Sequence, residues 1–384
     1  MITRTLELKL SEIRRQFPAI AILGPRQSGK TTLAKKVFPN YRYVNLESLE
    51  ERAFALDDPK GFMERFKNEP GVILDEIQKA PHLLSYIQVA IDAEEQPGRF
   101  ILTGSQNILL NHGVSQTLAG RVALMTLLPF SLSELRLANA LPDTAVKAIF
   151  QGFYPRIYQS HLDVVIFAES YIRTYIERDV RDIKQIIDLS DFQKFMRLCA
   201  ARIGQLLNIN SLATEAGISV PTVKAWLAVL EATYVIFLLQ PYHMNFNKRV
   251  VKMPKLYFYD TTLACHLLRI INPDSVYEHY LKGGLFESMI ISDLIKQRHH
   301  QGLPSNCYFW RDKLGNEIDV VQEEGGKIQA IEIKSSNTIN SNLFDGLKKW
   351  SAISETKLGE GQLIYAGLEN QQRTLGRVVS WRDI

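Results

Sequence analysis

A segment near the N-terminus has the residue types and spacing of a phosphate-binding loop. It runs from Gly24 to Thr31 and matches the pattern G-x-x-x-x-G-K-[ST]. Glycines let such a loop curl until several backbone N–H groups point at phosphate oxygens, and the N-terminus of the following helix adds partial positive charge. Lys30 would reach the β- and γ-phosphates of a nucleoside triphosphate, and the Thr31 hydroxyl would ligate Mg²⁺. The residues expected to contact the nucleotide are Gly24, Pro25, Arg26, Gln27, Ser28, Gly29, Lys30, Thr31 and Thr32.

Two acidic residues supply the second half of such a site. Asp75 is the last residue of the apolar run 72–75, and Glu76 follows it directly. They would therefore lie at the carboxyl edge of a sheet, where open α/β sheets bind their ligands. We expect Asp75 to hold Mg²⁺ through water and Glu76 to orient or polarise the attacking water. The alternative is that the two acids cap the next helix, which the nearby phosphate loop disfavours.

Two further residues are candidates for the catalytic step. Ser105 follows another apolar run and is the preferred polar group for contacting the γ-phosphate or the attacking water, with Thr103 and Asn107 as rivals. An ordinary turn at the end of a strand explains this segment equally well. Arg121 follows Leu118-Ala-Gly and would stabilise charge in the transition state, in cis or from a neighbouring subunit. A surface arginine without a catalytic role is nearly as good an explanation.

The elements that must position these residues are short apolar strands separated by helical patterns and loops. Such alternation predicts an α/β fold with a parallel sheet that is covered on both faces. A helix over 32–38 would follow the phosphate loop. The predicted strands lie at 19–23, 43–46, 72–75, 100–103 and 122–128.

Composition limits the class of protein. The chain has 384 residues, 46% hydrophobic and 22% charged, with a net charge of +4. These values exclude a disordered chain, a fibre and a disulfide-stapled miniprotein. No apolar stretch approaches the roughly 18 residues of a membrane span. Three scattered cysteines are too few for a disulfide framework or a zinc site, so we expect a cytoplasmic protein. The cysteines are Cys199, Cys265 and Cys307.

Together the motifs resemble a family of prokaryotic predicted ATPases of the AAA superfamily that carry a C-terminal domain of unknown function. The resemblance implies a P-loop NTPase of the AAA type, with ATP and Mg²⁺ as cofactors. It covers nearly the whole chain and departs in one place, where Asp260-Thr-Thr-Leu263 replaces an Asp-x-Gly-Leu turn. The segments that carry it are 24–32, 73–78, 103–105, 118–121, 171–180 and 255–260.

The middle of the chain contains a candidate helix-turn-helix. A largely helical region, 141–200, includes a predicted helix over 167–187, and two short helices follow at 210–230. Gly217 suits a helix C-cap and Ser219 an N-cap. Val223, Leu227 and Leu230 would be buried, and Thr222 and Lys224 would face outward, with Trp226 as a further candidate for the outward face.

The stretch after these helices resembles a winged hairpin, so 201–272 is predicted to be a winged helix-turn-helix. Contact with DNA and packing against a protein are about equally good interpretations, since the basic cluster is weak. The polar and basic residues expected near the tip of the wing are His243, Asn245, Asn247, Lys248 and Arg249.

The C-terminal region, 273–384, contains acids and a lysine in an ordered arrangement. Glu332 and Lys334 lie two apart, so on one face of a strand, and a hairpin at Gly325-Gly326 would bring Asp319 beside Glu332. A divalent ion between Asp319 and Glu332 would bind a water and lower its pKa, with Lys334 positioning that water and Glu287 contributing from a helix. A surface Glu–Lys pair on an amphipathic strand is the alternative.

This arrangement resembles the PD-(D/E)xK nuclease superfamily, which implies a restriction-endonuclease-like α/β domain. With the ATPase domain placed at 1–140, the primary hypothesis is an ATPase that couples Mg-ATP turnover to binding or metal-dependent cleavage of nucleic acid. One alternative is an ATP-operated switch that grips DNA or RNA without cleavage, and another is a signalling ATPase that docks a protein partner. We expect no membrane partner and leave a homo-oligomer open.

Overall fold

The computed structural model describes residues 2–94, 96–105, 118–176, 189–242, 252–354 and 359–384. Contacts divide the chain into two compact units. The first contains residues 1–130, 232–234 and 298–304, and the second contains 131–231, 235–297 and 305–384. None of the helices formed by the described residues is both long and apolar enough to cross a bilayer. The bounds of the four domains predicted above stay predictions.

The first unit is built on a parallel sheet, as the sequence predicts. Its strand order is β2-β3-β4-β1-β5, and each pair of neighbours runs parallel. Parallel strands covered on both faces are apolar at nearly every position, which is why short unbroken apolar runs mark them in the sequence. The strands are β1 (Ala19–Leu23), β2 (Arg42–Asn45), β3 (Val72–Asp75), β4 (Phe100–Gly104) and β5 (Val122–Thr126).

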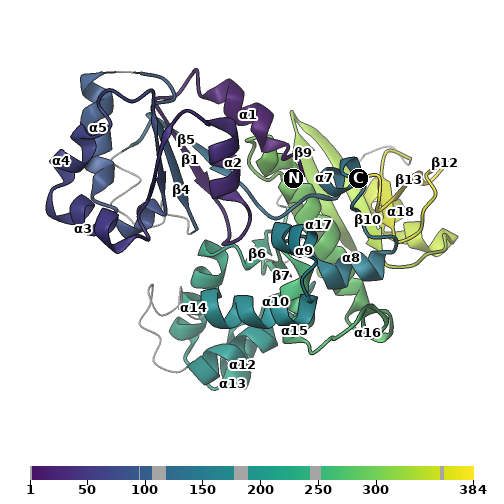
Figure 1. Ribbon diagram of the computed structural model, residues 1–384. Helices are drawn as coiled ribbons and strands as arrows, with labels where there is room; N and C mark the ends of the chain where they lie inside the picture. Colours follow the sequence, from purple (N-terminus) through teal and green to yellow (C-terminus); the bar gives the residue numbers. More distant parts are fainter. Residues whose placement is uncertain (1, 95, 106–117, 177–188, 243–251, 355–358) are drawn as a thin grey trace. The chain divides into compact units, whose positions relative to one another are not determined.

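Helices flank this sheet (Figure 1). Amphipathic spacing on α1 buries Leu6 and Leu10 in the core that also contains Ile20 and Ile101 from the sheet. The helix predicted after the phosphate loop begins two residues earlier than expected, at Lys30. The helices are α1 (Leu6–Ile13), α2 (Lys30–Val37), α3 (Leu49–Asp57), α4 (Pro59–Glu64) and α5 (Leu83–Ala93).

The second unit begins with helices. The helix predicted over 167–187 is shorter in its described part, because α10 starts at Val164 and passes after Tyr171 into a π-helical turn, Ile172–Ile176. The rest of that prediction lies outside the described residues. The helices of this part are α7 (Leu132–Leu137), α8 (Ala145–Gln151), α9 (Pro155–Ser160), α10 (Val164–Tyr171), α12 (Leu189–Ala200), α13 (Ile209–Ala216), α14 (Val220–Ala232), α15 (Thr261–Leu267) and α16 (Pro273–Glu278).

Two helices meet at the predicted turn. α13 ends at Gly217, whose φ of +78° is left-handed, and the Ser219 hydroxyl accepts a hydrogen bond from the Thr222 N–H at 3.2 Å. The outward placement of Trp226 is wrong. Trp226 is 6% exposed and packs edge-on against Phe192 and Phe195. It lies three residues after Val223, so it shares the buried face of α14.

An antiparallel pair follows these helices, formed by β6 (Ile236–Leu239) and β7 (Lys255–Phe258). The wing-tip residues predicted at 243–249 lie outside the described residues. At the unusual Asp260-Thr-Thr-Leu263 segment, the Asp260 carboxylate accepts hydrogen bonds from the N–H groups of Thr262 and Phe153. Asp260 thereby caps α15, so the two threonines begin a helix and glycine is not needed.

The C-terminal part of the second unit is a mixed sheet in the order β12-β13-β11-β10-β9-β8. β9 and β10 form the predicted hairpin, and Gly325 and Gly326 both take positive φ at its turn. Trp310 and Trp350 pack edge-on in the core between the sheet and α18. The elements are α17 (Lys282–His300), α18 (Asp345–Ser354), β8 (Cys307–Arg311), β9 (Glu317–Glu324), β10 (Lys327–Lys334), β11 (Gln362–Tyr365), β12 (Gln371–Arg373) and β13 (Gly376–Ser380).

Candidate functional site

The segment 24–31 joins β1 to α2 in the manner of a phosphate-binding loop. Gly24 has a φ of +149°, and a Cβ there would collide with the carbonyl oxygen of Leu127, so the position requires glycine. Gly29, with a φ of +93°, immediately precedes α2. The first N–H groups of this helix have no intrahelical partner and carry the positive end of its dipole. The loop therefore offers backbone donors to an anion.

Side chains of the loop also fit a phosphate. The ammonium group of Lys30 is nearly buried and donates to the carbonyl oxygens of Gly24 and Pro25 at 3.0 and 2.8 Å. The hydroxyl of Ser28 and the amide oxygen of Gln27 are buried and lack a hydrogen-bond partner among the described residues. A buried hydroxyl without a partner is costly. The cradle thus contains a cation and a polar group that a bound phosphate would satisfy.

Arg4 supports this loop from outside the motif. Its guanidinium is 6% exposed and donates to the carbonyl oxygens of Ser28 and Leu128 at 2.8 and 2.6 Å. Sequence reasoning missed Arg4, since an isolated arginine before the first strand has no local pattern. These two hydrogen bonds tie the loop to the segment that follows β5.

Asp75 lies opposite the loop and receives hydroxyl donors from three elements. The Thr31 hydroxyl is 3.1 and 2.9 Å from its two carboxylate oxygens, and the Tyr43 hydroxyl donates to it at 2.7 Å. Thr103 donates a further hydrogen bond. Burial, together with this hydrogen bond to Asp75, raises the pKa of Tyr43 well above its usual range. Hydroxyl and carboxylate oxygens are the ligands that Mg²⁺ prefers, so Thr31 and Asp75 fit the ion predicted there.

Glu76 is held in an unusual backbone conformation beside a second polar network. Its φ of +59° is left-handed, which is uncommon for a residue with a Cβ and is found most often at functional sites. The Ser105 hydroxyl donates to its carboxylate at 3.2 Å, and the side-chain amide of Gln78 donates to both Glu76 and Ser105. Ser105 therefore lies against the predicted catalytic acid. Asn107, its rival, lies outside the described residues.

Arg121 is engaged in an ion pair away from the phosphate loop. Its guanidinium makes two hydrogen bonds with the Asp92 carboxylate, at 2.6 and 3.1 Å, on the surface of the first unit. A role for Arg121 in the transition state stays a prediction, and it requires this ion pair to open.

The structure brings the C-terminal candidates together at one end of the mixed sheet. The ammonium group of Lys334 lies 3.1 Å from the Asp319 carboxylate and also contacts Glu332. Asp319 accepts a further hydrogen bond from the N–H of Ile333 at 2.8 Å. The hairpin predicted from the sequence is what places Asp319 and Glu332 side by side.

Three residues of this cluster were missed. Lys255 lies 3.1 Å from Glu287 and also contacts Glu317, while the Tyr257 hydroxyl donates to Glu287. Lys255 and Tyr257 lie two residues apart on β7, so their side chains share one face of the strand. This spacing can be seen in the sequence, but the sequence does not show that Glu287 contacts that face.

The two lysines set the charge of the cluster. Burial raises the pKa of Glu332 to about 9, and the Asp319 carboxylate adds to the rise. Burial alone would raise the pKa of Asp319, but Lys334 and Lys255 hold it below its usual value. Burial likewise raises the pKa of Glu287 against the opposing charge of Lys255. In the described parts of the chain, no three acidic, histidine or cysteine side chains are arranged to hold a metal ion.

The cluster as it stands therefore fits lysine ammonium groups better than a three-carboxylate metal site. Asp319 and Glu332 are adjacent and share Lys334, and Glu287 is engaged by Lys255 and Tyr257. The predicted three-residue set of metal ligands is not assembled in these contacts.

Removing Lys255 should destabilise the second unit. Lys255→Met leaves the mostly buried Glu287 without its ammonium partner, and breaking such a pair costs about 3 kcal/mol or more of unfolding free energy. Denaturant unfolding followed by tryptophan fluorescence measures the loss. Lys313→Met, at an exposed position without a described partner, is the control and should change stability little. Equal, small effects of both substitutions would contradict the structural role of Lys255.

The raised pKa of Glu332 makes stability depend on pH. The folded chain keeps a proton on Glu332 that the unfolded chain releases above its ordinary pKa of 4.5. Stability therefore decreases as the pH rises from 4.5 towards about 9. Glu332→Gln should flatten this dependence, which melting temperatures at acidic, neutral and alkaline pH will show. Glu278→Gln, on an exposed glutamate, should leave the slope as it is in the wild type.

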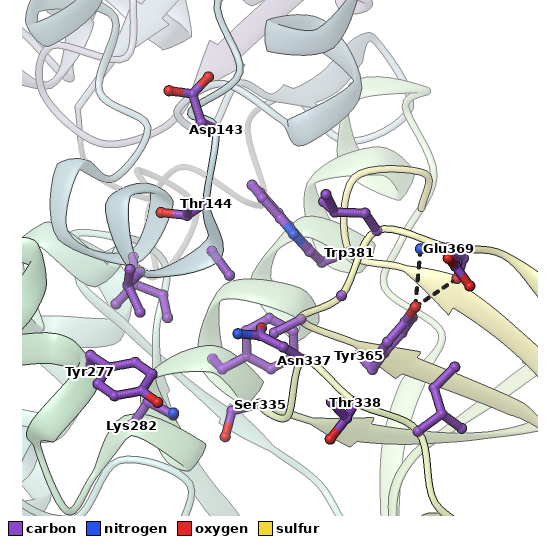
Figure 2. A pocket seen from close by; sticks show the side chains of 18 of the residues that line it. Asp143, Thr144, Tyr277, Lys282, Ser335, Asn337, Thr338, Tyr365, Glu369 and Trp381 are labelled. Carbon is purple, nitrogen blue, oxygen red and sulfur yellow. Dashed lines mark hydrogen bonds between the residues drawn. The ribbon is translucent and has the colours of Figure 1, made fainter.

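A cavity of 680 Å³ also lies in the second unit, beyond the ends of β10 and β11. Figure 2 shows Tyr277 and Lys282 on one side of it and Tyr365 and Glu369 on the other. The Tyr365 hydroxyl both accepts from and donates to the backbone of Glu369 at 3.0 Å. The volume suits a small molecule. The positive charges of Lys282 and Arg373 in the lining are balanced by Asp143 and Glu369. The lining therefore favours no single class of ligand.

Comparisons with known proteins match separate parts of the chain. Residues 16–136 match an AAA domain, 143–274 a domain of unknown function (DUF8612) and 282–384 a domain of unknown function (DUF4143). Two uncharacterised proteins, Rv2008c of Mycobacterium tuberculosis and Mb2031c of Mycobacterium bovis, are each 26% identical over 374 residues. These alignments cover 95% of this chain and 80% of each relative.

Two solved structures align with part of the chain at low sequence identity. The Walker-type ATPase paby2304 of Pyrococcus abyssi is 16% identical with a TM-score of 0.47, and 70% of this chain aligns with 96% of that one. The RuvB Holliday junction branch migration motor of Thermotoga maritima is 17% identical with a TM-score of 0.31, and 60% of this chain aligns with 88% of it. The matched domains and the loop geometry agree: the chain combines a P-loop ATPase domain of the AAA type with a C-terminal DUF4143 domain.

Proposed function

We propose that this chain is an ATPase whose first unit binds and hydrolyses Mg-ATP. The observation that carries the proposal is the hydrogen bond between Thr31, at the end of the phosphate loop, and Asp75, at the end of β3. It brings a hydroxyl and a carboxylate together beside a loop built to receive phosphates. The AAA domain match over residues 16–136 supports the same activity.

Each residue of the site would have a separate role in ATP hydrolysis. On nucleotide binding, Lys30 would exchange its two carbonyl partners for the β- and γ-phosphate oxygens and stabilise the charge that develops in transfer. Thr31 and Asp75 would hold Mg²⁺, which neutralises phosphate charge when bound. Glu76 would accept a proton from the attacking water or orient it, while Ser105 and Gln78 fix its carboxylate.

Calorimetry and phosphate release test this proposal on the full chain. We expect uptake of one equivalent of ATP in the presence of Mg²⁺, followed by steady release of phosphate. A folded protein that takes up neither adenine nor guanine nucleotides would refute it.

Metal-dependent cleavage of nucleic acid by the C-terminal domain is the second candidate. Adjacent Asp319 and Glu332, with Lys334 against both, favour it, because a cation between two neighbouring carboxylates stabilises their negative charge. Incubation with single-stranded, duplex and RNA ligands and Mg²⁺ or Mn²⁺, analysed on gels, tests it. Asp319→Ala should abolish any cleavage; a nuclease activity that survives this change arises elsewhere.

The middle of the chain could act in either of two ways when ATP switches the protein. The α13–α14 pair would bind DNA, or it would bind a protein partner. Either role would be carried out in the cytoplasm, by a single chain or by a homo-oligomer. Lys224 is exposed near the start of α14, whereas Trp226 is buried and not available to a partner. DNA binding that weakens steeply with salt would favour the nucleic-acid role over the protein scaffold.

A further inference from the structure

A second cavity in the second unit lies among α10, α12 and α15. Its volume is 340 Å³. α15 contacts both α10 and α12, and Figure 1 shows the three helices side by side. The floor is apolar and buried. It is formed by Ile172, Met196, Leu267 and Ile270.

Three arginines from separate elements line this cavity. Arg173 comes from the π-helical turn, Arg197 from α12 and Arg269 from the residues after α15. All three are exposed, so their charged ends lie at the rim. Nothing local in the sequence joins Arg173 to positions 197 and 269, so the sequence alone does not indicate this group.

The positive charge of this rim is not balanced by the described residues. The guanidinium of Arg269 makes no hydrogen bond or ion pair with any of them, and that of Arg197 donates only to the carbonyl of Gln193, at 3.4 Å. Among the described residues that line the cavity, Glu169 is the acidic one. Its carboxylate is shared by His266 at 2.8 Å and Arg173 at 3.5 Å.

Such an arrangement favours an anion. Exposed guanidinium groups around one cavity produce a positive potential there, which attracts negative charge. Guanidinium groups match the oxygens of a phosphate and bind it through paired hydrogen bonds. We propose that this cavity binds a phosphate ester, with the phosphate between the arginines and the organic part on the apolar floor. A free nucleotide and a nucleic-acid strand both carry this group.

Two probes distinguish these sources. AMP, titrated calorimetrically, represents the free nucleotide, and a fluorescein-labelled single-stranded oligothymidylate, followed by polarisation, represents the strand. All measurements use the full chain with Lys30→Ala, so that binding at the phosphate loop contributes little and the outcome does not depend on the ATPase proposal. Binding of either probe at the rim identifies the source, and binding of neither overturns the proposal.

Variants of the rim locate the binding. Arg269→Gln and Arg197→Gln should each weaken the probe by about tenfold, the effect of losing one charge-assisted contact. Glu169→Gln should strengthen it, because it removes the competing carboxylate. Arg156→Gln, on an exposed arginine of α9 that does not line the cavity, is the matched control and should leave affinity unchanged.

A thermal readout separates a ligand site from a structural arginine. In the ligand-free chain, the exposed Arg269 side chain pairs with none of the described residues, so Arg269→Gln should leave the melting temperature unchanged or raise it while probe binding falls. A lower melting temperature together with weaker binding would show that Arg269 supports the fold. Unchanged probe affinity in both arginine variants would place the binding elsewhere. Either result overturns the proposal.

Discussion

Replacing Lys30 by alanine is expected to lower the rate of ATP hydrolysis by at least about 100-fold, the effect of removing one group aimed at developing charge. The Lys30 ammonium group is nearly buried in the phosphate loop and held by two carbonyl oxygens. Without it, the negative charge that develops on the transferred phosphate has one cation fewer, and the triphosphate itself binds more weakly. Phosphate release under saturating ATP and calorimetric titration measure the two losses separately.

The control for this change is Lys36→Ala, on the same helix. Lys36 is partly exposed and pairs with Glu7 at 2.7 Å, so its loss changes surface charge by the same amount without touching the loop. Surface pairs contribute little to stability. Full turnover in Lys30→Ala would refute the site, and an equal loss in Lys36→Ala would show that net charge, not position, is responsible.

The parallel sheet could be predicted closely because its signal is local. The bounds of β1 and β3 coincide with the apolar runs 19–23 and 72–75. A strand that is buried on both faces is apolar at nearly every position, so it appears in the sequence as an unbroken apolar run. The hairpin around Gly325-Gly326 was equally visible, since two adjacent glycines between alternating runs demand a tight turn.

The partners of the site residues could not be predicted because they come from distant segments. Tyr43 reaches Asp75 only because β2 and β3 pair in parallel with Tyr43 beside Ile73. Lys255 meets Glu287 only after β7 is placed against α17. Neither residue has a motif of its own, so its role depends on a register that the sequence does not display.

The error at Trp226 has a different physical origin. A tryptophan at the edge of a predicted helix face has room to turn either way, and the deciding partners, Phe192 and Phe195, lie some thirty residues earlier in the chain. Burying a large aromatic side chain against two others stabilises the fold more than leaving it exposed for a binding partner would. The face of α14 was therefore wider than its aliphatic residues indicated.

Glu76→Gln is expected to separate nucleotide binding from hydrolysis. The amide has nearly the shape of the carboxylate and can still accept a hydrogen bond from Ser105, so the left-handed turn at Glu76 should persist. What is lost is the negative charge that orients the water and takes its proton, an effect of about 100-fold or more on turnover. ATP affinity, set by the loop and by Thr31 and Asp75, should change little.

Glu64→Gln is the matched control, on an exposed acid of α4 that lies 4.0 Å from Lys67. If Glu76→Gln lowers ATP affinity as much as turnover, the acid serves mainly to shape the site through Gln78 and Ser105. If neither changes, the attacking water is activated by another group. Only loss of turnover with retained binding assigns the proton transfer to Glu76, because the substitution removes a charge while conserving the shape around it.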